Sequence, residues 1–294
     1  MKRFVVLMLA MLLIFGMVIG AKRISVGAKN FTEQFIVSNM ISLLLEANGF
    51  DVRENFGMSS FAVRTALVTD QVDVYADYTG TAWMTYLKQT ELVSDPNTLF
   101  EKVKEMDAEN GIIWLPPADF NNTYALAVTR DFAQQHGLRT LTDLAGLINS
   151  TDENIIMGID FEFYDRADGF FAMADAYGMN VPKNWVKTME IGLTYEAINR
   201  GDLDVAMVFS TDGKLEKYNL VVLTDDKHFF PIYSLAVTAR EDILAQYPEI
   251  VEILRPLSLY LNEKIMIRLN YLVDAEGYEP DTVAENFLNG LGLL

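Results

Sequence analysis

The stretch RTALVTDQVDVYADYTGT, residues 64–81, decides the fold because a second version of it follows 131 residues later. That second version, YEAINRGDLDVAMVFSTD, occupies residues 195–212 and aligns with the first without a gap. The same offset places ISVG, residues 24–27, over IIMG, residues 155–158, so an apolar strand precedes each copy. This period is far too long for a solenoid. We therefore predict two similar lobes.

Short strands alternate with helices in the first copy. Its elements are expected at residues 23–27 (strand), Asn30 to Asn48 (helix), 51–55 (strand), 60–68 (helix) and 72–76 (strand). Asn30 and Glu33 have the spacing of a capping box, so the first helix is expected to start there, with Glu33 as a cap. Such alternation predicts an α/β fold whose parallel sheets are covered by helices on both faces.

Two apolar runs that share the letters LAVT are predicted to carry the chain between the lobes. They are YALAVT, residues 124–129, and IYSLAVT, residues 232–238. On this interpretation residues 22–125 together with 233–294 form lobe 1, and residues 126–232 form lobe 2. The section after residue 241 is expected to be helical and to pack on lobe 1.

The N-terminal residues MKRFVVLMLAMLLIFGMVIGAKR have the layout of a secretory signal, with two basic residues before an uncharged run over residues 4–21. We expect removal of residues 1–21 by cleavage after Gly20 or Ala21, and a periplasmic or otherwise extracytoplasmic protein. An uncleaved membrane anchor stays open, because the run is just long enough to span a bilayer. The sequence has no cysteine, which excludes a lipid-anchored lipoprotein.

Composition and motifs argue against nucleic-acid binding and catalysis. The formal net charge of −18 disfavours nucleic acid and anionic lipid as partners. Without cysteine there is no thiolate metal site or cysteine nucleophile, and no GxSxG elbow, HExxH helix or P-loop occurs. His136 and His228 lie far apart, and Asp225 and Asp226 would point in opposite directions on an extended chain. We predict a protein that is not an enzyme and has no metal or cofactor.

Six segments, in this order, resemble one known family. They are KNFTEQ (29–34), YTGTAW (78–83), NNTYAL (121–126), FYDRADGF (163–170), FSTDGKLEKYNLVVLTDDKHFFPIY (209–233) and the terminal VAENFLNGLGLL. The family is the substrate-binding proteins of ABC importers for quaternary-ammonium osmoprotectants such as glycine betaine, proline betaine, choline and carnitine. The resemblance implies a two-lobed periplasmic-binding-protein fold, type II-like, with two crossing hinge strands and the ligand in the interlobe cleft. It also implies a monomer that delivers its ligand to an ABC permease and ATPase.

The resemblance further assigns ligand-binding residues. Family members hold the trimethylammonium group in a box of aromatic rings from both lobes, and the matching residues are Tyr78, Tyr124, Phe209 and Tyr233. Betaine-binding members meet the ligand's carboxylate with a lysine, a threonine and an arginine, matched here by Lys29, Thr81 and Arg166.

Three positions depart from the family's pattern. Phe209 replaces the usual tyrosine, which keeps a cation–π face but loses a hydroxyl. Ala82 stands where choline-preferring relatives tend to carry aspartate, which counts against choline as the main ligand. Asn122 stands where some members carry an acid, so any help that a carboxylate gives the cation there is absent or different.

The chemistry of these residues fits such a ligand. A quaternary ammonium has no N–H to donate, so it is recognised by aromatic faces, each worth roughly 2 kcal/mol when desolvated. Lys29 precedes a presumed helix start, where the helix dipole favours an anion, and Arg166 adds a bidentate grip. The sequence predicts an exported solute-binding protein of the betaine type. A membrane-anchored ligand-sensing ectodomain for a choline- or carnitine-like ligand is the alternative, and the order of ligand preference stays open.

Overall fold

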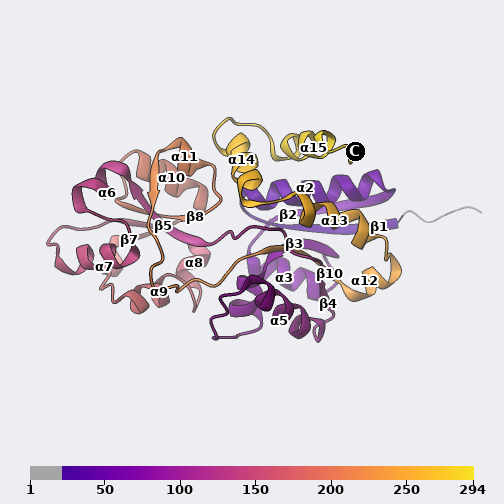
Figure 1. Ribbon diagram of the computed structural model, residues 1–294, viewed down its shortest axis with the longest axis horizontal. Helices are drawn as coiled ribbons and strands as arrows, with labels where there is room; N and C mark the ends of the chain where they lie inside the picture. The colour runs from indigo at the N-terminus through magenta and orange to yellow at the C-terminus, as the bar shows by residue number, and fades with distance from the viewer. Residues whose placement is uncertain (1–21) are drawn as a thin grey trace, which may run out of the picture.

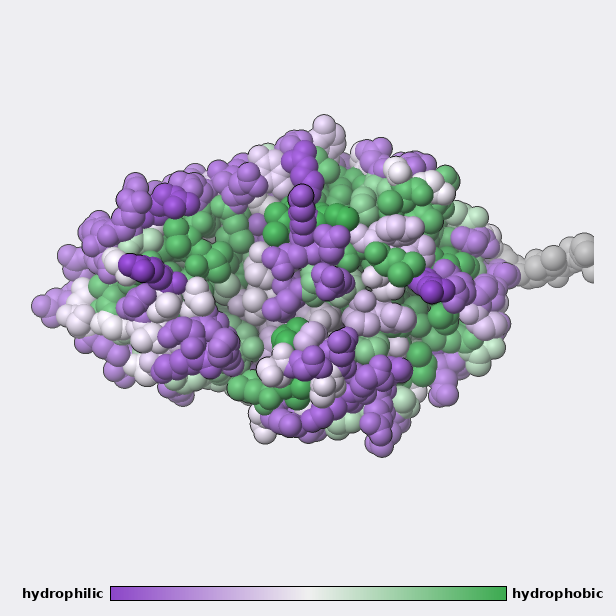
Figure 2. All heavy atoms as spheres, in the orientation of Figure 1, coloured by the Kyte–Doolittle hydropathy of each residue, from purple (hydrophilic) through white to green (hydrophobic). Residues whose placement is uncertain are grey.

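The computed structural model describes residues 22–294, which form two α/β lobes that lie one beyond the other along the molecule (Figure 1). The predicted signal peptide, residues 1–21, lies outside the described residues. Within residues 22–294, no helix has both the length and the apolar character needed to span a membrane. Hydrophilic side chains are spread over both lobes on the face that Figure 2 presents, in keeping with the acidic composition.

Each lobe contains one five-stranded sheet. The first sheet has the order β2 (Phe50–Met58), β1 (Lys22–Lys29), β3 (Val74–Tyr78), β10 (Leu235–Arg240) and β4 (Ile112–Trp114). The second has the order β7 (Val186–Met189), β6 (Met157–Asp160), β8 (Val205–Phe209), β5 (Tyr124–Thr129) and β9 (Leu220–Val222). In both sheets three parallel strands are followed by an antiparallel one.

The two sheets follow one pattern, as the internal repeat predicts. The offset seen in the sequence carries β3 onto β8, and helix α3 (Ser60–Val68) onto α10 (Ile191–Asn199), with identical bounds. It also relates two hydrogen bonds: Asp73 accepts from the backbone N–H of Ser25, and Asp204 from that of Ile156, both at 2.7 Å. The repeat therefore places Tyr78 and Phe209 at the same end of equivalent strands.

Helices cover both faces of the sheets. In lobe 1, α2 (Thr32–Ala47), α13 (Ile250–Tyr260), α14 (Glu263–Asp274) and α15 (Pro280–Gly290) lie on one face, with α3 and α5 (Pro96–Ala108) on the other (Figure 1). Lobe 1 also contains the short α4 (Thr79–Thr81), the π-helix η1 (Ala82–Tyr86) and α12 (Glu241–Gln246). Besides α10, lobe 2 carries α6 (Arg130–His136), α7 (Leu141–Ser150), α8 (Phe161–Asp165), α9 (Phe170–Tyr177), η2 (Lys183–Trp185) and α11 (Lys214–Lys217).

The chain crosses between the lobes in the short segments that precede β5 and β10. These segments meet at an antiparallel bridge between Asn121 and Ser234, and the backbone N–H of Asn122 donates to the carbonyl oxygen of Tyr233 at 3.1 Å. The two LAVT runs themselves each belong to one sheet, because β5 pairs with β8 and β9, and β10 with β3 and β4. We keep the division at residues 125/126 and 232/233 as a proposal.

The first helix begins later than the sequence predicts. β1 continues to Lys29, and α2 starts at Thr32 with Phe31 as its N-cap residue, whose side chain makes no capping hydrogen bond. The predicted capping box of Asn30 and Glu33 is therefore wrong. Asn30 donates to Glu190 of lobe 2 at 3.4 Å, and Glu33 turns into the interior, where it is fully buried.

Candidate functional site

A cleft of about 1030 Å³ lies between the lobes and is lined by residues of both. All the residues that the sequence suggested for ligand binding line it: Lys29, Tyr78, Thr81, Tyr124, Arg166, Phe209 and Tyr233. Five carboxylates line the cleft against three cationic side chains: Asp160, Glu162, Asp165, Asp168 and Glu190 against Lys29, Lys88 and Arg166. Burial raises the pKa of Asp160 to about 6. The lining thus combines aromatic rings with an excess of acids.

The predicted rings form a continuous group only through a fifth ring. The ring centroid of Tyr124 lies 5.2 Å from that of Phe209 and 5.5 Å from that of Tyr233. Tyr78 reaches this group through Phe31, whose ring is 6.2 Å from Tyr78 and 5.0 Å from Phe209. Phe31 also lines the cleft. The group therefore takes Phe31 and Tyr78 from lobe 1 and Phe209 from lobe 2.

Sequence reasoning missed Phe31, although a signal was present. N-cap positions favour Ser, Thr, Asp, Asn and Gly, whose short or absent side chains suit a free helix end. An aromatic residue at the N-cap of α2 is therefore not explained by helix formation. Its ring is instead used in the cleft, beside Phe209.

Glu33 lies behind the rings and accepts four hydrogen bonds. One oxygen, Oε1, accepts from the Tyr78 hydroxyl and from Asn122 Nδ2, both at 2.8 Å. The other, Oε2, accepts from the Thr211 hydroxyl at 2.7 Å and from Asn270 Nδ2 at 3.0 Å. Burial raises the pKa of Glu33, and these four hydrogen bonds oppose that rise. Its carboxylate joins β3, a crossing segment, lobe 2 and α14.

Lys29 enters the cleft with its charge already paired. Its Nζ lies 2.5 Å from Asp77 Oδ1, and both side chains are buried. Asp77 also accepts hydrogen bonds from the Tyr75 hydroxyl and from the backbone N–H of Tyr78. The Lys29 Nζ is 5.1 Å from the centroid of the Tyr78 ring. Asp77 therefore fixes both the lysine and the end of β3.

Arg166 is likewise held by protein carboxylates. Its Nε and Nη2 donate to the two oxygens of Asp168 at 3.1 and 2.5 Å, and its Nη1 lies 3.6 Å from Glu162 Oε1. Nη1 also donates to the Tyr124 hydroxyl at 3.2 Å. Asp168 is not a freely solvated acid, because its side chain is 16% exposed and binds the guanidinium group.

Thr81 and Gly80 bring the backbone of α4 close to Tyr233. Thr81 is 3% exposed and lines the cleft. A β-carbon on Gly80 would lie 2.7 Å from the Tyr233 ring, so glycine at this position permits the ring to rest on the backbone. Gly80 therefore serves a close approach between the backbone and the Tyr233 ring.

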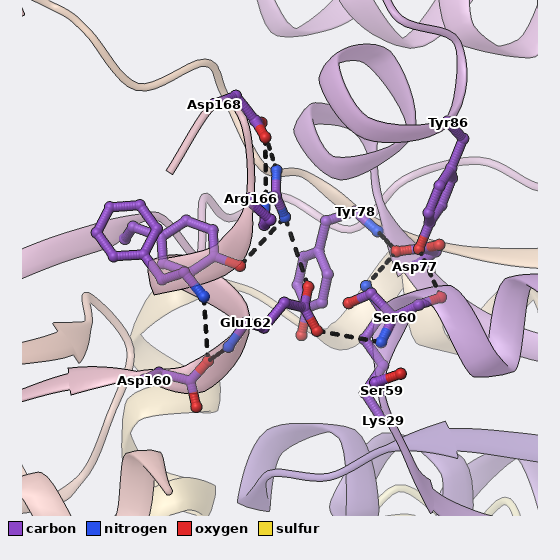
Figure 3. A network of polar contacts seen from close by, with 12 residues as sticks. Lys29, Ser59, Ser60, Asp77, Tyr78, Tyr86, Asp160, Glu162, Arg166 and Asp168 are labelled. Carbon is purple, nitrogen blue, oxygen red and sulfur yellow. Dashed lines mark hydrogen bonds and ion pairs between the residues drawn. The ribbon is translucent and has the colours of Figure 1, made fainter. Parts of the chain in front are cut away.

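Direct contacts hold the lobes together across the cleft. Glu162 Oε2, from α8 of lobe 2, accepts from the backbone N–H of Ser60 at the start of α3, at 3.1 Å. Figure 3 shows this carboxylate between Arg166 and Ser60. The free N–H groups and dipole of a helix N-terminus favour such a carboxylate. With the Asn30–Glu190 and Thr211–Glu33 contacts, it keeps the lobes close together.

The other polar candidates are accounted for by the fold. Asp225 accepts from the Tyr177 hydroxyl and from the backbone N–H groups of Phe229 and Phe230, whereas Asp226 pairs with Thr142. Among residues 22–294 no group of three or more His, Cys, Asp or Glu side chains is placed to hold a metal ion.

Comparison with known proteins finds one family for residues 22–290. A family model described as the substrate binding domain of ABC-type glycine betaine transport system matches residues 22–290. A glycine-betaine-binding protein of Pseudomonas aeruginosa is 33% identical over 93% of this chain and 89% of its own length. An ergothioneine transport permease/ergothioneine binding protein of Helicobacter pylori is 34% identical over 99% of this chain, which spans 51% of that longer protein.

A solved structure agrees in fold. The crystal structure of a glycine betaine/carnitine/choline ABC transporter protein superimposes with a TM-score of 0.72 at 31% sequence identity. The match covers 92% of this chain and 99% of that one.

Proposed function

This chain belongs to the family of substrate-binding domains of ABC-type glycine betaine transport systems, and from that premise we propose how it captures its solute. A family member of this kind is an extracytoplasmic transport component and not an enzyme. The proposed ligand carries a quaternary ammonium, held by Tyr78, Tyr124, Phe209 and Tyr233 together with Phe31. The proposed partners are an ABC permease and its ATPase, which receive the ligand from a monomeric binding protein.

The observation that carries the proposal is the group of rings drawn from both lobes around one acidic cleft. Each desolvated aromatic face contributes roughly 1–2 kcal/mol to holding a cation that cannot donate hydrogen bonds. Micromolar binding requires about 8 kcal/mol in total, so several rings acting together supply much of what is needed. Because the rings belong to both lobes, a cation among them favours the closed arrangement over an open one.

The carboxylate of a betaine would meet cationic side chains that are already paired with protein carboxylates, whereas the sequence suggested free ones. We propose that Thr81, Lys29 and Arg166 receive it, since all three line the cleft. Lys29 and Arg166 already have carboxylate partners in Asp77 and Asp168. Asp168, whose side chain is 16% exposed, is therefore the group with which a ligand carboxylate competes for Arg166.

A larger betaine with a polar tail is the second candidate ligand. The cleft of about 1030 Å³ lies at the upper end of the roughly 300–1,000 Å³ usual for small-molecule pockets. The Thr85 hydroxyl, four residues beyond Thr81, lines the cleft, is buried and has no hydrogen-bond partner. A ligand that extends past the rings would give this hydroxyl a partner.

Titration calorimetry with glycine betaine, proline betaine, carnitine, ergothioneine and choline tests both candidates. Replacement of Phe209 by leucine removes a half-buried ring that makes no side-chain hydrogen bond, and we expect about tenfold weaker binding. Phe61→Leu is the matched control, because Phe61 lines the cleft at 50% exposure outside the ring group. The proposal fails if no quaternary ammonium binds, or if both variants lose affinity equally.

A further inference from the structure

Asn122 lines the ligand cleft and has a buried side-chain carbonyl oxygen, Oδ1, without a hydrogen-bond partner. The residue is 5% exposed. Its Nδ2 donates to Glu33 at 2.8 Å, which fixes the amide orientation. The opposite orientation would set the carbonyl oxygen against the carboxylate. A buried acceptor left without a donor is costly, so the hydrogen bond to Glu33 holds this amide in place at the cost of an unsatisfied oxygen.

We propose that Glu33 is the counter-charge of the ligand's cation, acting through the Tyr78 ring and the Asn122 amide, which both bond to Glu33 and belong to residues that line the cleft. This inference rests on the proposed function and adds the source of negative charge to it. The acid that Asn122 lacks is thus supplied from one residue further away.

The hydrogen bonds of Glu33 favour its ionised form and oppose burial, which raises its pKa. Asn122 and Asn270 can only donate through Nδ2. The Tyr78 hydroxyl accepts from Gln34 Nε2 at 3.3 Å, which leaves its own proton for Glu33. Each carboxylate oxygen therefore receives at least one N–H or O–H proton that has no other acceptor.

The charge of Glu33 has no cationic partner among the residues that hold it. Its four hydrogen-bond donors are neutral, and they come from β3, a crossing segment, lobe 2 and α14. The neighbouring cations are committed elsewhere, Lys29 to Asp77 and Arg166 to Asp168. A buried, unpaired charge is unfavourable until an opposite charge approaches. A cation in the cleft meets this need, on the far side of Tyr78 and Asn122.

The test separates charge from hydrogen bonding. Glu33→Gln keeps the shape and removes the charge; Thr211→Val, its matched control, removes one hydrogen bond to Glu33 and leaves the charge. A unit charge one ring away, at an effective dielectric constant of about 20, corresponds to a roughly 10- to 100-fold change in affinity. We expect such a loss of glycine betaine binding in Glu33→Gln and less than about threefold in Thr211→Val. Similar losses in both variants would make Glu33 a purely structural residue and overturn the proposal.

The carbon isostere 3,3-dimethylbutanoate provides a second criterion, because it has the shape and carboxylate of glycine betaine without the cation. The wild-type protein should bind it at least tenfold more weakly, and this gap should narrow in Glu33→Gln. Equal wild-type affinity for both would overturn the inference. Failure of the wild-type protein to bind any quaternary ammonium would instead refute the proposed function itself.

Asn122→Ala keeps the experiment decisive if Glu33→Gln does not fold. That variant retains the Glu33 side chain and loses the amide that bonds to it beside the cleft. We expect glycine betaine to bind about 3- to 10-fold more weakly, with the melting temperature of the free protein measured alongside. An unchanged affinity would show that the Asn122 amide does not couple Glu33 to the cation.

Discussion

Replacement of Gly80 by alanine should weaken ligand binding by displacing Tyr233. A β-carbon on Gly80 would lie 2.7 and 2.8 Å from two carbons of the Tyr233 ring, and 2.9 Å from the carbonyl oxygen of Ile232. Such distances are too short to persist. The ring is the part that can move, whereas the carbonyl belongs to the backbone of a crossing segment. Because the Tyr233 ring is 5.5 Å from Tyr124, its displacement opens the ring group.

The expected magnitude follows from two separate effects. Loss of one desolvated cation–π face is worth about 1–2 kcal/mol, which corresponds to roughly 5- to 30-fold weaker binding. The added methyl group in a packed site lowers the free energy of unfolding by about 1–3 kcal/mol. Binding and stability should therefore both fall, and only the first effect should depend on the Tyr233 ring.

A double-mutant cycle with Tyr233→Ala separates them. Calorimetry should show that Gly80→Ala costs roughly 5- to 30-fold in affinity in the wild-type background. In the Tyr233→Ala background the same change should cost less than about twofold, since no ring remains to be displaced. Gly146→Ala is the control: it lies in α7, and a β-carbon there meets nothing within 4 Å. Additive losses, or wild-type affinity in Gly80→Ala, would refute the reasoning.

Three further predictions follow from the site. Lys29→Ala and Arg166→Ala should weaken glycine betaine binding at least tenfold more than choline binding by calorimetry, because choline lacks a carboxylate; equal losses would remove these residues from the anion site. Glu162→Ala should raise the ligand dissociation rate about threefold in stopped-flow measurements, since a carboxylate at a helix N-terminus contributes about 0.3–1 kcal/mol; an unchanged rate would separate this contact from closure. Burial raises the pKa of Asp212 to about 7, so the native state holds the proton of this carboxyl group more tightly than the unfolded state does. The stability that this proton contributes is lost as the pH rises from about 4 to about 7. The difference in melting temperature between Asp212→Asn and the wild-type protein should therefore shift in favour of the variant between about pH 4 and about pH 7, and stay constant at higher pH. A difference that does not depend on pH would contradict the raised pKa of Asp212.

The sequence predicts most of the fold because the repeat carries long-range information in a local pattern. The equivalence of Tyr78 and Phe209 at two strand ends needs only an alignment of the chain with itself, and the helix over residues 60–68 has its predicted bounds. No repeat or other sequence pattern indicated the buried position of Glu33. Its partners Asn122, Thr211 and Asn270 lie 89, 178 and 237 residues away in the chain. An Asn-x-x-Glu spacing looks the same whether the glutamate caps a helix or turns inward.

The sequence also did not predict how the charged side chains of the cleft are paired, and this pairing affects which end of a ligand determines its affinity. A lysine and an arginine at matching positions suggest free anion-binding groups, but Asp77 and Asp168 already neutralise Lys29 and Arg166. A ligand carboxylate gains only the difference between its own contacts and the pair that it disturbs, and such differences are small for well-formed buried pairs. The quaternary ammonium meets less competition. Lys29 lies 5.1 Å from the Tyr78 ring centroid and Arg166 lies 5.4 Å from that of Tyr124, but among the described residues no lysine or arginine lies over the Phe31, Phe209 or Tyr233 ring. Affinity in this cleft should therefore depend mainly on the cationic end, with the carboxylate end deciding among ligands that share it.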